Sequence, residues 1–115
     1  MSQAPEVRRM TTTEGGQNGK NVFVDCKGEL NSGELMTGSL TIPAVSGLTI
    51  SNEAVSNASF LINEGEPDER TVPAGEGVQF NVKSTTAGTY TITGWANTDS
   101  TPSQTVDFIV KLKVE

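Results

Sequence analysis

The sequence contains no histidine and a single cysteine, Cys26, among its 115 residues. Without histidine the chain cannot form a Ser-His-Asp or Cys-His catalytic pair, and it lacks the imidazole that commonly ligates metals. One cysteine allows no intrachain disulfide, which excludes a small secreted domain held together by disulfides. Cys26 shares its alternation phase with Val22 and Val24, so we expect a small buried side chain rather than a reactive thiol.

Long apolar runs are also missing. No segment approaches the roughly 20 apolar residues of a membrane-spanning helix. The N-terminus has no basic region followed by an apolar one, as a secretory signal does, and nothing hydrophobic follows Arg8-Arg9 as a twin-arginine signal would need. We therefore expect neither a membrane partner nor export by a visible signal.

Positive charge is scarce. Eight basic residues face 14 acidic ones, giving a net charge of −6 and a pI near 4.5. Neutralising phosphates needs clustered lysine and arginine, so this balance argues against a nucleic-acid partner. Residues 1–20 differ, because three basic and two acidic side chains give them a net charge of +1, which leaves −7 for the rest. This segment is either an arm that docks on an acidic surface or a solvated tail.

The apolar residues that are present alternate with polar ones along the last third of the chain. Such a period of two is what a strand with one face in a core and the other in water requires. No window longer than one turn has the periodicity of a helix. The alternating apolar residues are Val78, Phe80, Val82, Tyr90, Ile92, Val106, Phe108, Val110, Leu112 and Val114.

Shorter alternating segments lie upstream, with turn signals about every 8–12 residues, a spacing typical of a β-sandwich or small barrel. Residues 1–20 lack apolar periodicity and are expected to form an extended arm or flexible lead, with one domain over 21–115. The expected upstream strands run through residues 22–26, 35–42, 48–50 and 58–63, with a short edge strand over 70–72.

The segment from Thr86 to Ile92 carries the most information about the fold. In immunoglobulin-like domains a glycine-containing turn precedes a tyrosine whose hydroxyl bonds to nearby backbone, two residues before a buried anchor. Tyr90 and Ile92 fit these two places. Trp95 is out of phase with Tyr90 and Ile92, so in a regular strand its side chain points away from the core. It is either exposed as an anchor for another subunit or turned inward by a bend at Gly94.

Five short phrases follow one another along the chain: Leu30–Glu34, Ser39–Ile42, Gly47–Ile50, Ala87–Thr93 and Asp107–Val110. Their order and spacing resemble those of the immunoglobulin-like virion proteins of tailed bacteriophages, over about residues 22–114. The resemblance implies an all-β fold, an immunoglobulin-like antiparallel β-sandwich of about seven strands with an extended N-terminal arm. Two features depart from the pattern. Asp25-Cys26 stands where Asp-Trp is often found, and the loop 63–77 is longer and more acidic.

The resemblance implies a structural role in the virion, without enzymatic activity or a cofactor. Such proteins are made in the host cytoplasm, decorate and cement the capsid exterior, bind the major capsid protein and are commonly homotrimers. An extended arm would lie across neighbouring capsid subunits and become ordered only on binding. The residues expected to bind the partner are Pro5, Val7, Arg8, Arg9, Met10 and Trp95.

Two other functions stay open. The chain could be a head-tail connector or a tail or fibre adaptor of the virion. It could also be a carbohydrate-binding immunoglobulin-like adhesion module that uses Trp95 and Tyr90 as stacking platforms.

Chemistry in the acidic loop 63–77 is disfavoured. A glycosidase needs two carboxylates at a fixed separation, which a flexible loop does not hold. Calcium binding through Glu64, Glu66 and Asp68 lacks the glycine that an EF-hand loop has at its sixth position, where Glu69 stands. We expect a solvated, solubilising loop.

Overall fold

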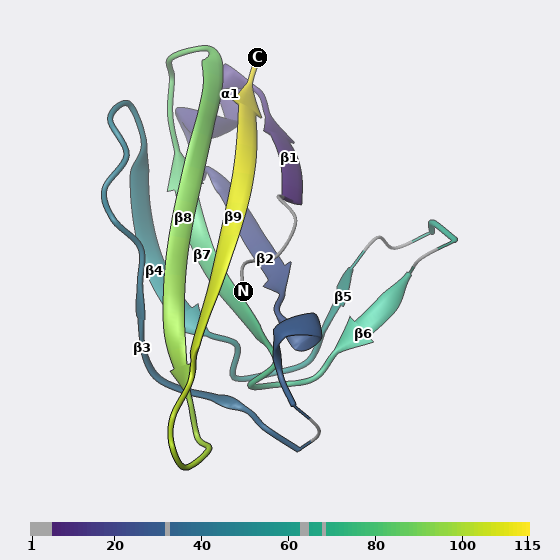
Figure 1. Ribbon diagram of the computed structural model, residues 1–115. Helices are drawn as coiled ribbons and strands as arrows, with labels where there is room; N and C mark the ends of the chain where they lie inside the picture. Colours follow the sequence, from purple (N-terminus) through teal and green to yellow (C-terminus); the bar gives the residue numbers. More distant parts are fainter. Residues whose placement is uncertain (1–5, 32, 63–64, 68) are drawn as a thin grey trace.

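The computed structural model of the protein describes residues 6–31, 33–62, 65–67 and 69–115 (Figure 1). Strands predominate, with one single-turn α-helix and one 3₁₀ turn in this part of the chain. The elements are β1 (Glu6–Met10), α1 (Thr12–Gly15), β2 (Lys20–Asp25), the 3₁₀ turn η1 (Lys27–Glu29), β3 (Met36–Thr41), β4 (Thr49–Val55), β5 (Phe60–Ile62), β6 (Arg70–Val72), β7 (Gly77–Lys83), β8 (Gly88–Thr98) and β9 (Thr105–Val114).

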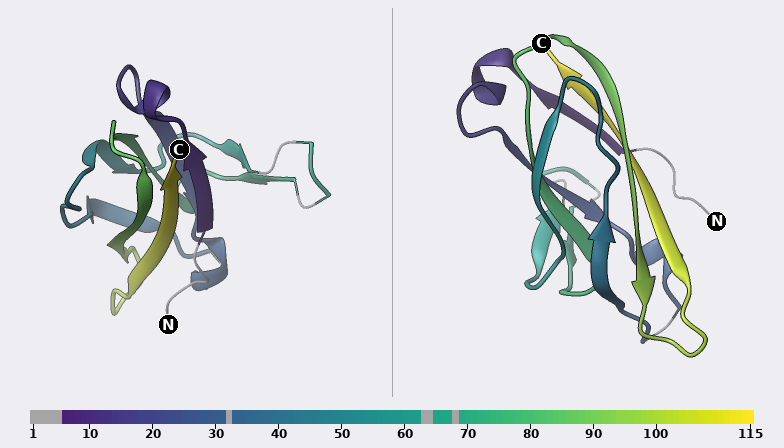
Figure 2. Two further views of the ribbon diagram at one scale, coloured as in Figure 1. Left: turned by 90° about the horizontal axis from the view of Figure 1, so that it is seen from above. Right: turned by 90° about the vertical axis from the view of Figure 1, so that its left-hand side faces the viewer.

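Two sheets face each other as a β-sandwich. One has the strand order β1-β9-β8-β3 and the other the order β2-β7-β4. Every pairing is antiparallel except that of β1 with β9, which is parallel. The strands β5 and β6 form a separate two-stranded hairpin that points away from both layers (Figure 2). The all-β sandwich expected from the alternation of the sequence is confirmed.

The core lies between the two sheets and is built from the alternating residues. Phe80 of β7 and Phe108 of β9 meet there with ring centroids 6.2 Å apart. Burying an aliphatic or aromatic side chain of this kind contributes roughly 1.5–3 kcal/mol relative to leaving it exposed. The buried apolar residues of the core are Met10, Val22, Val24, Cys26, Met36, Leu40, Val78, Phe80, Val82, Ile92, Ala96, Val106, Phe108, Val110, Leu112 and Val114.

The N-terminal segment is part of the domain rather than an arm beside it. β1 pairs with β9 from Glu6, opposite Val110, to Met10, opposite Val114. Met10 is buried in the core, and its carbonyl accepts a hydrogen bond from the Glu115 amide at 2.8 Å. The prediction of an arm over 1–20 is therefore wrong for residues 6–20. Residues 1–5 lie outside the described residues.

The error has a physical cause. A short edge strand buries few side chains, so β1 shows almost no apolar alternation in the sequence. Its two arginines are also typical of a solvated segment. The helix α1 did carry a signal, because Thr11 and Glu14 have the spacing of a capping box. The Thr11 amide donates to the Glu14 carboxylate at 2.9 Å, and the Glu14 amide donates to the Thr11 hydroxyl at 3.0 Å.

Replacing Met10 with alanine tests this integration. Met10→Ala removes a fully buried side chain, so we expect a loss of about 2–5 kcal/mol in the free energy of unfolding, measured by urea denaturation. The control Val7→Ala changes an exposed residue of the same strand and should stay within about 0.5 kcal/mol of wild type. Equal effects of the two substitutions would contradict the buried place of Met10.

The corner before β8 forms as the sequence predicts. The Tyr90 hydroxyl donates to the backbone carbonyl of Thr86 at 2.8 Å, and Ile92 is fully buried. β8 then continues without a bend at Gly94, where an added Cβ would lie 2.5 Å from the Phe108 ring. Gly94 therefore leaves room for Phe108, and Trp95 keeps its outward phase.

Removing the tyrosine hydroxyl should weaken this corner by a measurable amount. Tyr90→Phe keeps the ring and loses one hydrogen bond, so we expect about 0.5–1.5 kcal/mol lower unfolding free energy. Thr93→Val, which removes an exposed hydroxyl from the same strand, is the control and should cost less. Equal stability of Tyr90→Phe and wild type in chemical denaturation would show that the corner bond contributes nothing.

Candidate partner-binding face

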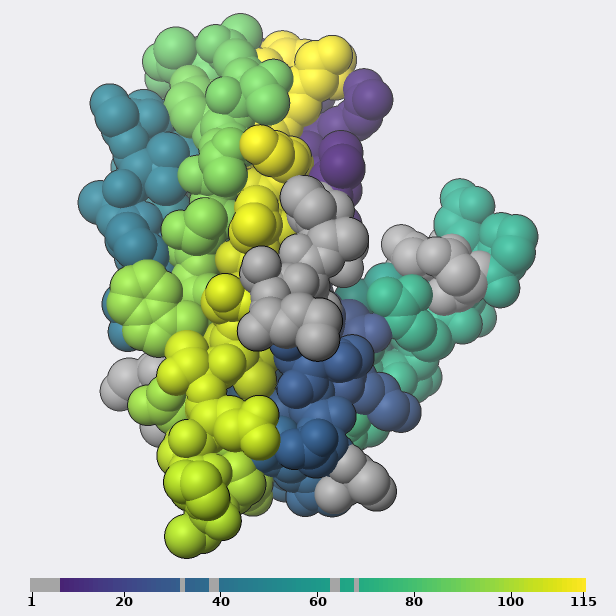
Figure 3. Space-filling model, viewed as in Figure 1, coloured from purple at the N-terminus to yellow at the C-terminus, as the bar shows by residue number. Residues whose placement is uncertain are grey.

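The outer face of the four-stranded sheet carries several of the residues expected to bind a partner. Side chains alternate on these strands, so those not in the core point outward from this sheet. Figure 3 views the molecule from this side, with β8 and β9 crossing its centre. We call this surface the β8–β9 face. Its described outward residues include Val7, Arg9, Thr89, Thr91, Thr93, Trp95, Asn97, Asp107, Ile109, Lys111 and Lys113.

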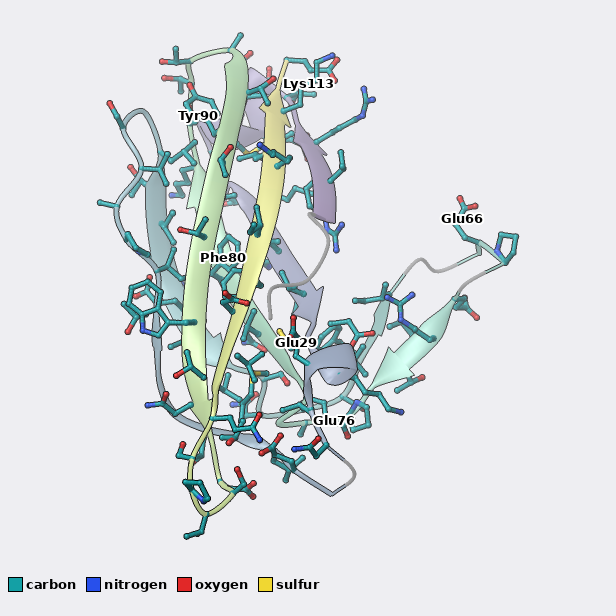
Figure 4. The ribbon with its side chains drawn as sticks, in the orientation of Figure 1. Glu29, Glu66, Glu76, Phe80, Tyr90 and Lys113 are labelled. Atoms are coloured by element: carbon teal, nitrogen blue, oxygen red, sulfur yellow. The ribbon has the colours of Figure 1, made fainter. Side chains whose placement is uncertain are left out.

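Basic side chains gather at the end of this face nearest the C-terminus. The strand register places Arg9 beside Lys113, and Val7 beside Lys111. Figure 4 shows Lys113 close to the end of β9. The Arg9 guanidinium pairs with the Glu115 carboxylate at 3.0 Å, and both side chains stay largely exposed. An exposed pair of this kind holds the side chains loosely and leaves the cations available to an acidic surface.

The aromatic part of the face lies further along the strands. Trp95 is 42% exposed and stands opposite Asp107 on β9 and Thr41 on β3. Asp107 is four residues before Lys111, which is about 13 Å in an extended strand. A half-exposed indole on the same face as several cations is a composition typical of protein–protein contacts, because tryptophan and arginine are enriched at such sites.

The six predicted partner residues do not all share this face. Val7, Arg9 and Trp95 do. Met10 was wrongly predicted, because it faces the core and cannot touch a partner. Arg8 turns toward the neighbouring sheet, where its guanidinium donates to the carbonyl of Phe23 at 3.0 Å. Pro5 lies outside the described residues.

Two basic residues of the face, Lys111 and Lys113, were missed in the sequence. The alternation of these lysines with Leu112 and Val114 predicts a strand without indicating which strand lies beside it. The same alternation places both lysines on the solvent side beside β1, but only once β1 is known to pair with β9. The Lys111 ammonium donates to the Thr91 hydroxyl at 3.1 Å, which steadies this side chain on the face.

Among the described residues, Asp107 and Glu34 each have a buried carboxylate oxygen without a hydrogen-bond partner, and of the two only Glu34 is buried as a whole residue. Its Oε1 accepts from the Asn31 amide at 3.0 Å, whereas Oε2 is buried without a fully formed hydrogen bond to any described residue. The Ser100 hydroxyl is the main cause that lowers the pKa of Glu34, followed by the Asn31 amide, while desolvation opposes them. Glu34 therefore stays ionised and secures the loop before β3 to the turn between β8 and β9.

Acid should release this attachment. Because the pKa of Glu34 is lower in the folded than in the unfolded protein, its contribution to stability is complete above its ordinary value of 4.5 and is lost as the pH falls through the folded pKa. We expect Glu34→Gln to lower the unfolding midpoint at pH 7, and the difference from wild type to shrink below about pH 4.5. A difference that is the same at pH 7 and pH 3 would contradict this role.

Within the described ranges, no three acidic or cysteine side chains gather as ligands for a metal ion. Glu64 and Asp68, considered above for calcium, lie outside those ranges. None of the helices in the described part of the chain is long and apolar enough to span a membrane. The sequence matches no protein-family profile and no curated protein.

Proposed function

We propose that this chain is a non-enzymatic structural protein of a bacteriophage virion that decorates and cements the capsid exterior. It binds the major capsid protein through the β8–β9 face. The observation that carries the proposal is the combination of an exposed tryptophan with three cations, Arg9, Lys111 and Lys113, on one rigid face of an acidic protein.

The immunoglobulin-like character of the fold is part of the proposal. Constant-type immunoglobulin sheets contain the strand runs B-E-D and C-F-G. With β2 as strand B, the orders β2-β7-β4 and β3-β8-β9 follow the same runs. The hydrogen bond from Tyr90 to Thr86 corresponds to the tyrosine corner of such domains. These features support the resemblance on which the virion role rests.

The β8–β9 face replaces the flexible arm as the binding element. Residues 6–10 are already ordered in β1, so binding does not have to order them. A preformed face loses less conformational entropy on association than a segment that folds on its partner. Electrostatic attraction between its cations and an acidic capsid surface would also speed the encounter.

Carbohydrate binding is the second candidate. It is favoured by Trp95, whose half-exposed ring lies beside Thr93 and Asn97 on the strand β8. Tyr90 is less suited than expected to stacking on a sugar, because its hydroxyl is held by Thr86. A head-tail connector or a tail or fibre adaptor would use the same face. It would differ from a capsid cement protein in copy number, with a few rings of subunits per virion in place of hundreds of copies.

Co-sedimentation with empty capsids of the same virion tests the proposal. We expect wild type to bind, and Trp95→Ala and Arg9→Glu each to weaken binding at least about tenfold, as substitutions of interface anchors do. Lys83→Glu, an exposed charge change on the opposite sheet, is the matched control and should bind as wild type does. Unfolding midpoints would verify that all variants remain folded.

Two results would count against capsid binding. One is the absence of wild-type protein from the capsid pellet at low salt, where electrostatic attraction is strongest. The other is an equal loss with Lys83→Glu and Trp95→Ala. Glycan-array binding that Trp95→Ala abolishes would favour the adhesion module instead.

A further inference from the structure

The hairpin formed by β5 and β6 stands away from the body of the molecule (Figure 3). Its base is anchored by Phe60, whose ring lies 5.1 Å from that of Phe23 and covers Gly77, where an added Cβ would be 2.5 Å from the ring. Ile62 and Val72 are buried there as well. A two-stranded hairpin is at best marginally stable on its own in water, so these contacts with the body hold its base in place.

The outer end of the hairpin is acidic. Figure 4 shows Glu66 at this end, far from the sandwich. The Glu69 carboxylate accepts from the Gly65 amide at 2.8 Å, which closes the turn. The described residues of this segment include two acidic side chains, Glu66 and Glu69, and one basic side chain, Arg70, which pairs with Asp25 at 2.8 Å.

A groove of about 470 Å³ lies at the other end of the hairpin, between β1, β2 and β5. Three cations, Arg8, Arg9 and Lys20, line it, and no acidic residue does among those described. Arg9 is paired with the Glu115 carboxylate, and Arg8 donates to the Phe23 carbonyl. Leu61 of the hairpin adds an apolar wall and is 51% exposed. The groove is therefore positive and partly apolar on a protein whose net charge is −6.

Two sheet edges flank this groove. β1 is the edge strand of one sheet and β2 is the edge strand of the other, so within the described chain neither has a neighbour on its outer side. The Arg8 guanidinium bridges them by donating to the Phe23 carbonyl. A turn with carboxylates on extended flanks suits a cleft of this shape and charge.

We propose that the groove binds the acidic tip of the β5–β6 hairpin of a second copy of this chain. Tip and groove lie at opposite ends of the same hairpin, because Leu61 lines the groove and Glu66 lies at the outer end. Two hairpins laid side by side in opposite directions therefore place each tip at the groove of the other. The contact forms twice in a two-fold pair, the commonest symmetry of protein oligomers.

This self-association does not depend on capsid binding. It uses the groove and the hairpin, whereas the proposed capsid contact uses the β8–β9 face. Val7 and Arg9 belong to both surfaces and are for that reason left unchanged in the test. A two-fold pair also differs from the trimer that the resemblance implies.

Charge reversal at each end of the contact provides the test. Glu66→Lys changes the tip and Lys20→Glu changes the groove, and sedimentation velocity over a range of protein and salt concentrations gives the association constant. Glu53→Lys and Lys83→Glu make the same charge changes at exposed positions of β4 and β7 and serve as matched controls. Lys20 also lowers the pKa of Glu14, so the unfolding midpoint of Lys20→Glu is measured alongside.

The expected pattern is specific. Wild type forms dimers that dissociate with added salt, each single reversal weakens association at least about tenfold, and the two controls do not. In this contact residue 66 of one copy faces residue 20 of the other. An equal mixture of the two single variants therefore restores dimers, because the positive charge introduced at position 66 then meets the negative charge introduced at position 20. The double variant restores dimers by itself.

Three results would overturn the proposal. One is a wild-type protein that stays monomeric at its highest soluble concentration. Another is a trimer in place of a dimer. The third is a loss of association in the single variants that neither the mixture nor the double variant repairs. If Lys20→Glu proves unstable, Leu61→Asp, which places an anion in the groove, takes its place and must weaken association in the same way.

Discussion

The structure depends on the packing of one ring, Phe108, between the two sheets. Its contact with Phe80 joins β9 to β7, and Gly94 on β8 gives it the space it occupies. A side chain at position 94 would force either the ring or the strand to move, because protein interiors hold few voids. The outward phase of Trp95 and the straight course of β8 both follow from this arrangement.

Most of the fold could be predicted because its long strands bury every second residue. β7, β8 and β9 have this pattern, and even the short β6 appears at its expected place. β1 could not be recognised, because it contributes Met10 to the core and leaves Val7 and Arg9 in solvent. Its pairing with β9 is a long-range interaction, and only the folded chain reveals such a partner.

The proposed binding surfaces could be predicted only in part, because strand pairing decides which side chains lie together. Trp95 lies three residues after Ile92 on the same strand, so the two side chains point to opposite faces. The sequence alone was therefore sufficient to predict that Trp95 is exposed. Arg9 lies beside Lys111 and Lys113 only because β1 is the neighbour of β9 in the sheet. Local sequence patterns do not specify this neighbour. The basic groove likewise combines residues of β1 and β2 with residues of β5, which is distant from both in the sequence.

The parallel pairing of β1 with β9 has a mechanical consequence. Hydrogen bonds in a parallel pair are evenly spaced along the strands, and here they join residues 6–10 to residues 110–114. Tension applied between the two ends of this part of the chain would pull β1 and β9 past each other in shear. The hydrogen bonds would then share the load and break together, rather than one after another from one end of the strand pair. A domain tied in this way resists a force that pulls its two ends apart along β1 and β9.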